Sequence, residues 1–308
     1  MRLTAQPTLE GMPEPLYPAT PARLATYLDC PRRYRLTYLD RPSPPRGAPW
    51  AHRAVGAAVH TALARWWALP LARRVPASGP VLLAAAWPVD GFRDTGQSQR
   101  TRLRVGGEVE RYLDGVDPGS PPVAVERTVR VATAHASLWG RVDRVDDRDG
   151  TGLVVVDYKT GRAVPTATEA GRSTALAVYA AAVSRVLRRR CRRVELHHLP
   201  SGAVAGFEHT EATLGAALAG ADRVAVELAR LDAGHAAAPD GSAADGSFPA
   251  RVAPRCGWCD VRGSCGPGRS VAAHLPWDGL PDESRGDGHG DTGVSPGDAP
   301  GHGDTGSP

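Results

Sequence analysis

The stretch VVVDYKTGR, from Val154 to Arg162, ends an apolar run with an acid and a base two residues apart. The valines predict a buried β-strand, on which Asp157 and Lys159 project from one face while Tyr158 points to the other. Lys159 is the only lysine among 37 basic residues. An exposed salt bridge at a strand end is one interpretation, but arginine would serve there equally well. The retained lysine favours a site where a compact point charge lies close to a reacting water or phosphate.

The sequence before this strand supplies further acids. GRVDRVD, from Gly140 to Asp146, places Asp143 on the neighbouring strand, and DRDG at 147–150 predicts the hairpin turn between the two strands. Across this hairpin the carboxylates of Asp143 and Asp157 can converge, which is costly unless a cation lies between them. Glu126, one strand earlier, is a further candidate acid. Oxygen ligands of this kind suit Mg²⁺ or Mn²⁺, which would bind a phosphate and lower the pKa of a water for attack.

The pattern around this hairpin predicts a mixed α/β fold. Thr20 and Pro21 predict a helix start, and Pro31 predicts a break just after Cys30. A Pro-rich linker at 41–50 precedes a helical pattern at 51–67, where His60 lies beside the apolar face, and residues 70–98 read as loop-rich. Further helices are predicted at 100–113, 172–189 and 210–231, and strands at 123–131, 137–147, 153–159, 194–199 and 203–208. Helices surrounding a mainly consecutive set of strands are typical of mixed α/β proteins.

Composition and charge narrow the class of protein. The N-terminus lacks an apolar signal region, and the longest strongly apolar run, VLLAAAW at 81–87, is too short to cross a bilayer, so we expect a cytoplasmic protein without a membrane partner. The C-terminal stretch repeats GHGDTG and has almost no large apolar residue, which predicts disorder. From Asp278 onward, seven acids and one arginine give a net charge of −6. The body therefore carries +4 + 6 = +10, which favours an acidic partner and nucleic acid first.

Together, GRVDRVD, the hairpin and VVVDYKTG resemble the PD-(D/E)XK nuclease superfamily and its RecB-type branch. The resemblance implies a restriction-endonuclease-like core, a central mixed sheet flanked by helices, with Asp143, Asp157 and Lys159 as catalytic residues. VGAAVHTAL at 55–63 resembles the upstream helix of this branch, which makes His60 a ligand of Mg²⁺ or Mn²⁺ beside Asp143, Asp157 and the backbone carbonyl of Tyr158. A structural role is the alternative for a lone histidine on a helix.

One feature of the chain departs from this family pattern. ALAVYAAA keeps Tyr179 on the helix after the active-site strand, but Ala175 stands where the family carries a glutamine. Tyr179 is therefore a candidate for nucleic-acid binding or a core residue.

The basic run RRRCRR adds Arg188, Arg189 and Arg190 as candidates for contacts along a phosphate backbone. A solvated helix end explains the run as well.

Three of the five cysteines are crowded near the C-terminus. Cys256, Cys259 and Cys265 have C-x2-C-x5-C spacing, which in a cytoplasmic protein indicates metal binding rather than disulfides. Zinc could take His274 or another cysteine as the fourth ligand. LATYLDCPRRYRLTYL resembles the N-terminal helix of the iron–sulfur RecB-type nucleases, and this implies that Cys30 completes a [4Fe–4S] site. Cys191 is left as a free thiol.

These features predict one nuclease domain over residues 1–277, with the catalytic core at 120–210, the cysteine subdomain at 20–40 and 250–270, and a disordered acidic tail at 278–308. The expected activity is that of a Mg²⁺- or Mn²⁺-dependent deoxyribonuclease, an exonuclease acting on single-stranded DNA or DNA ends in repair, recombination or processing. A role in CRISPR adaptation stays open.

Two other functions stay open beside this one. The first is a non-catalytic DNA-binding module that works with a separate helicase or another partner, and the second is a zinc-stapled hydrolase or RNA nuclease. A nucleotide-binding P-loop is not expected, because the only lysine belongs to DYKTG. A helicase motor would therefore belong to a separate chain.

Overall fold

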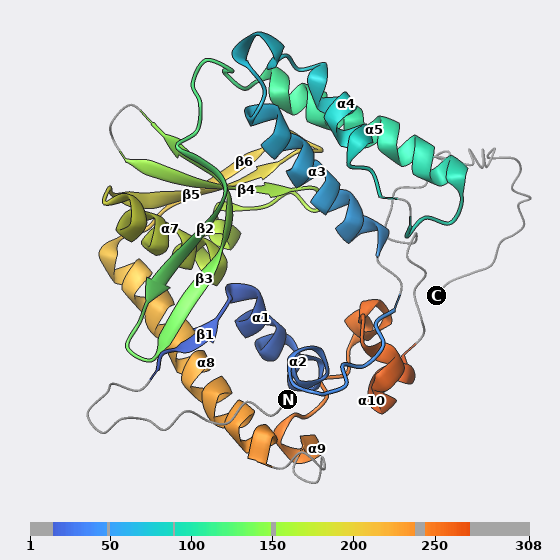
Figure 1. Cartoon of the computed structure of the whole chain (residues 1–308), viewed down its shortest axis with the longest axis vertical. Helices are drawn as coiled ribbons and strands as arrows, with labels where there is room; N and C mark the ends of the chain where they lie inside the picture. Colours follow the sequence, from blue (N-terminus) through green and yellow to red (C-terminus); the bar gives the residue numbers. More distant parts are fainter. Residues whose placement is uncertain (1–14, 48–49, 89, 149–151, 238–243, 272–308) are drawn as a thin grey trace, which may run out of the picture.

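The computed structural model describes residues 15–47, 50–88, 90–148, 152–237 and 244–271. One mixed sheet with helices on both sides organises these residues (Figure 1). The strands are β1 (Tyr17–Ala19), β2 (Ala124–Ala132), β3 (Ala136–Asp147), β4 (Leu153–Lys159), β5 (Cys191–His198) and β6 (Val204–Glu208). The α-helices are α1 (Pro21–Asp29), α2 (Pro31–Tyr38), α3 (Ala51–Trp67), α4 (Ser78–Ala85), α5 (Thr95–Asp114), α6 (Ala167–Arg172), α7 (Thr174–Leu187), α8 (Glu211–Ala237), α9 (Ala244–Ser247) and α10 (Gly266–Arg269). The predicted fold class, a mixed sheet flanked by helices, is confirmed.

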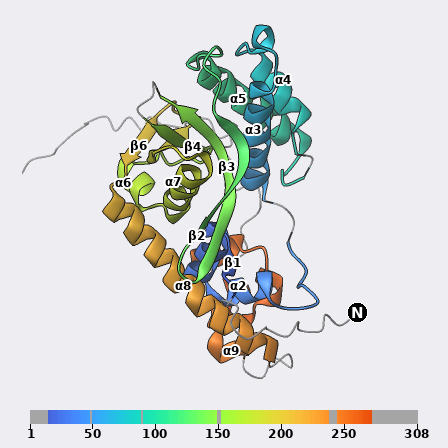
Figure 2. The same ribbon diagram turned by 60° about the vertical axis from the view of Figure 1, so that its left-hand side comes forward.

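Strand β3 is the organising strand of the sheet. It pairs with β2 in antiparallel fashion along one edge, while its first residues pair with β1 in parallel and its last residues pair with β4 in antiparallel fashion. Strand β4 continues to β5 in parallel, and β5 continues to β6 in antiparallel fashion. Figure 2 shows β3 as a long, bent strand. Because β1 pairs only up to Leu138 and β4 only from Arg144, residues 139–143 lie between these two pairings.

Two apolar cores cover the two faces of this sheet. One core joins Val155 of β4 to helices α1, α7 and α8, and the other joins Val154, Val156 and Tyr158 to helices α3, α4 and α5. The alternation follows from the two-residue period of a strand. Residues Leu153 to Val156 are all buried, as expected for a central strand that is covered on both faces.

The predicted N-terminal helices are confirmed, with the cap at Thr20 and the break at Pro31. The Thr20 hydroxyl accepts a hydrogen bond from the Arg23 N–H at 3.1 Å, and Pro21 occupies the first turn. Helix α1 ends at Asp29 and α2 begins at Pro31, because proline cannot continue the preceding helix but suits a first turn.

The interpretation of residues 70–98 as loop-rich is wrong in part, because helix α4 lies there and α5 begins earlier than predicted. Asp94 caps α5 by accepting a hydrogen bond from the Gln97 N–H at 2.7 Å. Helix α4 packs closely on α5, since a Cβ at Gly79 would come within 2.8 Å of Val109. Tertiary contact, with Leu83 fully buried, stabilises a helix whose own sequence carries a proline and little periodicity.

Most of the other predicted elements match within a few residues. The helix predicted over 172–189 is α7, which Ser173 caps, and α6 before it was not predicted. Helix α8 runs to Ala237, beyond its predicted end at 231. No helix in the described ranges combines the length and apolarity needed to cross a bilayer. The tail predicted at 278–308 lies outside the described residues, and the predicted domain boundaries stay predictions.

Candidate active site

Five of the residues singled out in the sequence gather where β3 and β4 separate beneath helix α3. The backbone ladder between the two strands runs from Asp147 opposite Leu153 to Arg144 opposite Val156 and then stops. Beyond it, the Oδ2 atom of Asp143 accepts the backbone N–H of Tyr158 at 3.0 Å. A side-chain oxygen thus satisfies a donor that the ladder has released, and this contact fixes the Asp143 carboxylate.

His60, Glu126 and Asp143 form a group of metal-binding type. One ligand atom from each lies within 4.8 Å of the others, on α3, β2 and β3 respectively. The Nδ1 atom of His60 lies 3.2 Å from Oδ1 of Asp143, and Oε2 of Glu126 lies 2.8 Å from Nε of Arg141. Imidazole nitrogen and carboxylate oxygen are donors that suit a divalent cation. In the described part of the chain this is the only such group of three.

A distortion of the strands brings Glu126 into this group. Glu126 has a φ of +48°, in the left-handed region that a non-glycine residue rarely adopts. On β3, Val142 and Val145 both reach the same core although they are three residues apart, so the two-residue alternation breaks at Asp143 and Arg144. The distortion therefore coincides on both strands with the two carboxylates of the group, and backbone strain of this kind concentrates at functional sites.

Asp157 and Lys159 form an ion pair beside the group. The Nζ atom of Lys159 lies 2.6 Å from Oδ2 of Asp157, and the lysine side chain is about half exposed, at 47%. Burial raises the pKa of Asp157, and the nearby carboxylate of Asp143 raises it further, against the opposing effects of Lys159 and His60. The ionised pair of aspartates is therefore only partly compensated by the protein itself.

The same imbalance affects the other members. Burial lowers the pKa of His60, but its hydrogen bond to Asp143 and the charges of Asp143, Asp157 and Glu126 outweigh burial, so the net shift is upward. Burial also raises the pKa of Glu126, Arg141 lowers it, and Asp143 raises it again. A divalent cation among these donors would offset the carboxylate repulsion, and the donor set therefore fits Mg²⁺ or Mn²⁺.

Tyr179 lies against the glycine of GRVD. A Cβ placed on Gly140 would come 2.6 Å from the Cε1 atom and 2.8 Å from the hydroxyl of Tyr179, so a larger residue at 140 would displace the ring. Burial raises the pKa of Tyr179, and the charges of Asp157 and Asp143 raise it further, which places the phenol near both carboxylates. Tyr179 is half-buried and packs against the core, so its position accommodates both of its predicted roles.

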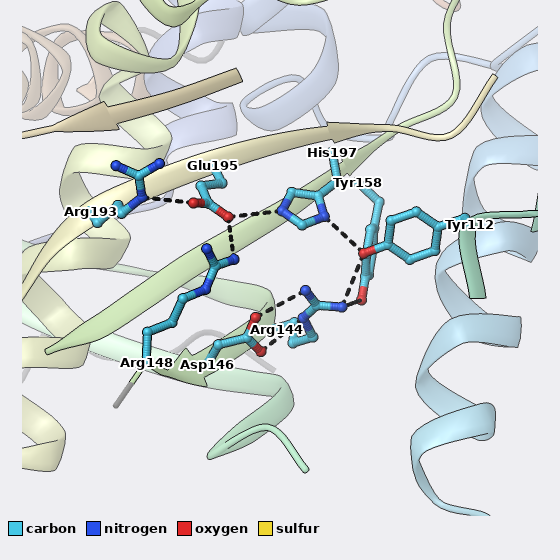
Figure 3. Close-up of polar contacts among 8 residues, drawn as sticks. All are labelled: Tyr112, Arg144, Asp146, Arg148, Tyr158, Arg193, Glu195 and His197. Atoms are coloured by element: carbon cyan, nitrogen blue, oxygen red, sulfur yellow. Dashed lines mark hydrogen bonds and ion pairs between the residues drawn. The ribbon is translucent and has the colours of Figure 1, made fainter. Parts of the chain in front are cut away.

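A polar network on the other face holds the two strands together behind the site (Figure 3). The buried guanidinium of Arg144 donates to the hydroxyls of Tyr112 at 3.0 Å and Tyr158 at 3.2 Å, and to Asp146 at 2.9 Å. The Tyr112 hydroxyl also contacts Nδ1 of His197 at 2.8 Å. Tyr158, whose backbone N–H binds Asp143, is part of this buried hydrogen-bonded network. Asp143 is the sequence neighbour of Arg144, the centre of the network.

The basic run lies at the opposite end of β4. Leu153, the first residue of β4, donates its N–H to the carbonyl of Arg190 at 2.7 Å, six residues before Lys159. At about 3.3 Å per residue this distance is about 20 Å. Arg189 makes a bidentate ion pair with Asp147 at 2.7 and 2.8 Å. The structure therefore does not bring Arg188, Arg189 and Arg190 to the candidate active site.

The four cysteines of the proposed cluster line one cavity between α2 and the C-terminal turns, but their sulfurs are not gathered as a ligand set. Cys30, Cys256, Cys259 and Cys265 share this cavity of about 120 Å³. Within the described residues, no three of these sulfurs lie within 4.8 Å of one another. This arrangement does not support an iron–sulfur cluster or a four-ligand zinc site, and His274 lies outside the described residues.

Cys191 is a free thiol, as predicted. It is fully buried in β5, and burial raises its pKa to about 12. A thiol with so high a pKa is unreactive at neutral pH.

Comparison with known proteins identifies the family. No curated protein matches the chain. Eighteen chains of solved structures match it. One, described as the crystal structure of SSO0001, has 14% identity over 83% of this chain and 88% of that chain, with a TM-score of 0.36, too low to carry an argument. The sequence profile of the PD-(D/E)XK nuclease superfamily matches residues 18–266, most of the chain and all of the candidate active site. The chain belongs to the PD-(D/E)XK nuclease superfamily.

Proposed function

We propose that this protein is a metal-dependent deoxyribonuclease that hydrolyses phosphodiester bonds. The observation that carries the proposal is the group of His60, Glu126 and Asp143, with ligand atoms within 4.8 Å, next to the ion pair of Asp157 and Lys159. Superfamily membership supports the reaction class. The net charge of +10 on the residues before Asp278 supports DNA as the substrate.

His60, Glu126 and Asp143 are the residues that would hold the cation. Asp157, the other carboxylate predicted as a ligand, interacts electrostatically with Asp143 and His60 but lies outside the group of three. A bound Mg²⁺ or Mn²⁺ supplies a Lewis acid for the phosphate and lowers the pKa of a water. The residues of the chain do the positioning. Tyr158 orients Asp143 through its backbone N–H, and His60 must be neutral at Nδ1 to act as a ligand.

Lys159 is the group that acts on the reacting atoms. Its ammonium is half exposed and held at Asp157, so it can orient the attacking water and stabilise the charge that develops on the phosphate. Arginine would spread the same charge over a planar group and would not fit a single oxygen in the same way.

Cleavage of end-labelled single- and double-stranded DNA, with Mg²⁺ or Mn²⁺ against EDTA, tests the proposal. Wild type should cut only with the metal, Lys159→Ala should lose activity, and Lys159→Arg should recover little of it. Asp114→Asn, an exposed carboxylate at the end of α5, is the matched control for Asp157→Asn and should cut normally. Normal cutting by Lys159→Ala or Asp157→Asn would contradict the proposal.

The exonuclease preference for single strands or DNA ends is the finer part of the proposal, and the product ladder of the same assay gives end preference and polarity. A second candidate function is a DNA-binding module without activity, and the absence of the family glutamine at Ala175 favours it. Wild type that binds DNA but never cuts it would select this function. A helicase partner would then be sought as a separate chain.

The iron–sulfur cluster is a separate prediction that rests on the resemblance of the N-terminal helix and on the cysteine spacing, and the arrangement of the sulfurs does not support it. Iron and acid-labile sulfide in anaerobically purified protein would support it, and zinc in their place would favour the stapled alternative. Protein that contains neither iron nor zinc would contradict both the iron–sulfur and the zinc prediction. The nuclease proposal would be unaffected, because none of the four cysteines belongs to the group of His60, Glu126 and Asp143.

A further inference from the structure

A groove along helix α3 is continuous with the candidate metal site. It has a volume of about 620 Å³, and its lining includes His60 and Glu126 together with Arg53, Arg65 and Arg141. Any molecule that fills this groove therefore touches two of the three residues of the ligand group. The three arginines make the walls of the groove basic, in contrast to the carboxylates beside it.

The face of α3 that lines the groove is built from small residues between two arginines. Arg53, Ala57, His60 and Ala64 recur at helical spacing and so lie on one side of the helix. The methyl groups of Ala57 and Ala64 leave the helix surface low on either side of His60. Arg53 and Arg65 are 12 residues apart, which corresponds to about 18 Å along the helix axis, and His60 lies between them.

Within the described residues, the side chains of Arg53 and Arg65 are not committed to another part of the fold. Both side chains are exposed, and neither makes a hydrogen bond or ion pair with any residue that the structure describes. Arg141 differs, because its Nε atom lies 2.8 Å from Glu126. Two uncommitted guanidinium groups on opposite sides of a candidate metal site are suited to bidentate contacts with phosphate.

We propose that the α3 groove binds one strand of nucleic acid, with Arg53 and Arg65 contacting backbone phosphates on opposite sides of the phosphate that lies at His60 and Glu126. The proposal deepens the nuclease function proposed above and rests on it. A groove of about 620 Å³ has the size of a small-molecule pocket, which suits a few nucleotides of a single strand rather than a whole duplex.

The proposal assigns to α3 the role that the basic run was predicted to have. In that run, Arg189, Arg192 and Arg193 are all engaged in ion pairs, with Asp147, Glu211 and Glu195 respectively. Arginines that already hold carboxylates gain less from a phosphate, because the existing ion pair must first be broken. The α3 groove also lies at the candidate metal site, whereas the run lies at the far end of β4.

Binding of a labelled single-stranded oligonucleotide in EDTA tests the groove without any cleavage. The full chain is compared with Arg53→Gln/Arg65→Gln and with Arg223→Gln/Arg230→Gln, two exposed arginines on helix α8. At 0.1 M salt the groove variant should bind about 25-fold more weakly, and its plot of log K against log salt should be shallower by about 1.4, since each single-strand phosphate contact contributes about 0.7. The α8 variant should match wild type.

Each outcome decides the proposal. Binding by Arg53→Gln/Arg65→Gln that equals wild type would overturn it, as would wild type that does not bind the oligonucleotide. A blunt duplex that binds as tightly, with the same loss in the groove variant, would overturn the assignment of a single strand. If wild type never cuts with Mg²⁺ or Mn²⁺ while the groove variant still loses binding, the groove is upheld and the nuclease function fails. Arg188→Gln/Arg190→Gln tests the rival run in the same titration.

Discussion

The two ends of strand β4 handle charge in opposite ways. At its amino end, Arg189 pairs with Asp147, and Arg148 and Arg193 both pair with Glu195, so these five charged groups have partners within the chain. At its carboxyl end, Asp157 pairs with the half-exposed Lys159, close to a group of two further carboxylates and a histidine. Paired charges cost the fold little, whereas carboxylates held close together are stable only with help from a cation. The difference separates a structural end of the strand from a chemical one.

Removing a carboxylate at the chemical end should have the largest effect on activity. We expect Asp157→Asn to lower the cleavage rate by about 10³-fold or more, a loss of about 4 kcal/mol of transition-state stabilisation. The same change should leave the melting temperature unchanged or raise it, because the pKa of Asp157 is raised in the folded chain and its ionised form is therefore disfavoured there. Single-turnover cleavage and thermal unfolding measure the two effects, and a lowered melting temperature would instead indicate a structural role.

Removing the guanidinium of Arg144, which lies between the two ends of β4, should have the largest effect on stability. Arg144 is buried and donates to Tyr112, Tyr158 and Asp146. Arg144→Leu would leave the Asp146 carboxylate without its ion pair, and we expect the free energy of unfolding to fall by about 3–5 kcal/mol. Urea denaturation measures this change. A variant as stable as wild type would show that the network does not hold β3 and β4 together.

Acid should weaken the paired charges through Glu195. Burial alone would raise its pKa, but the hydrogen bonds from His197 and Arg193 and the charge of Arg148 outweigh burial and lower the pKa to about 2. A carboxylate whose pKa is lowered on folding stabilises the fold at pH values above its unfolded pKa of 4.5. That stabilisation is lost as the pH falls towards the folded pKa of about 2. The contribution is on the order of 3 kcal/mol. Between pH 6 and pH 2, the free energy of unfolding should therefore fall less steeply for Glu195→Gln than for wild type. An unchanged slope would contradict this.

The smallest effect should come from the exposed pair at the amino end. Arg189 and Asp147 are both largely exposed, and water and salt screen such pairs. We expect Arg189→Gln to keep the melting temperature and the cleavage rate of wild type. A clear loss of cleavage in this variant would mean that the basic run takes part in binding DNA, and the contrast between the two ends would fail.

Local sequence patterns predicted most of the fold. Several local signals act within a few residues: the valine run, the cap at Thr20, the break at Pro31 and the hairpin after Asp147. The strands β2 to β6 and the helices α1, α2, α3 and α7 were therefore predicted to within a few residues, and only the end of α8 was placed too early. Helix α4 was missed because its stability comes from packing against α5, and no periodicity in residues 70–98 records that contact.

The candidate site was predictable only in part. The sequence singled out Asp143, Asp157 and Lys159 from one hairpin and noted Glu126 as a further acid, but it did not include Glu126 in the ligand set. The strand distortion that turns Glu126 toward His60 and Asp143 left no mark in the residue types around it. Arg53 and Arg65 were not predicted, because two arginines among 36 carry no signal until the helix face and the groove are known.

The sequence by itself determined the mixed α/β fold, the membership of the nuclease superfamily and the residues available for chemistry, because turns, caps and short motifs act over a few residues. Only the tertiary structure decided which of those residues meet. It brought His60 from α3 to Asp143 and Glu126, and it placed the basic run about 20 Å away from Lys159. Within the described residues, it left no three cysteine sulfurs within 4.8 Å of one another. The physical reason is that these contacts depend on sheet register and helix packing, which arise from many residues far apart in the chain.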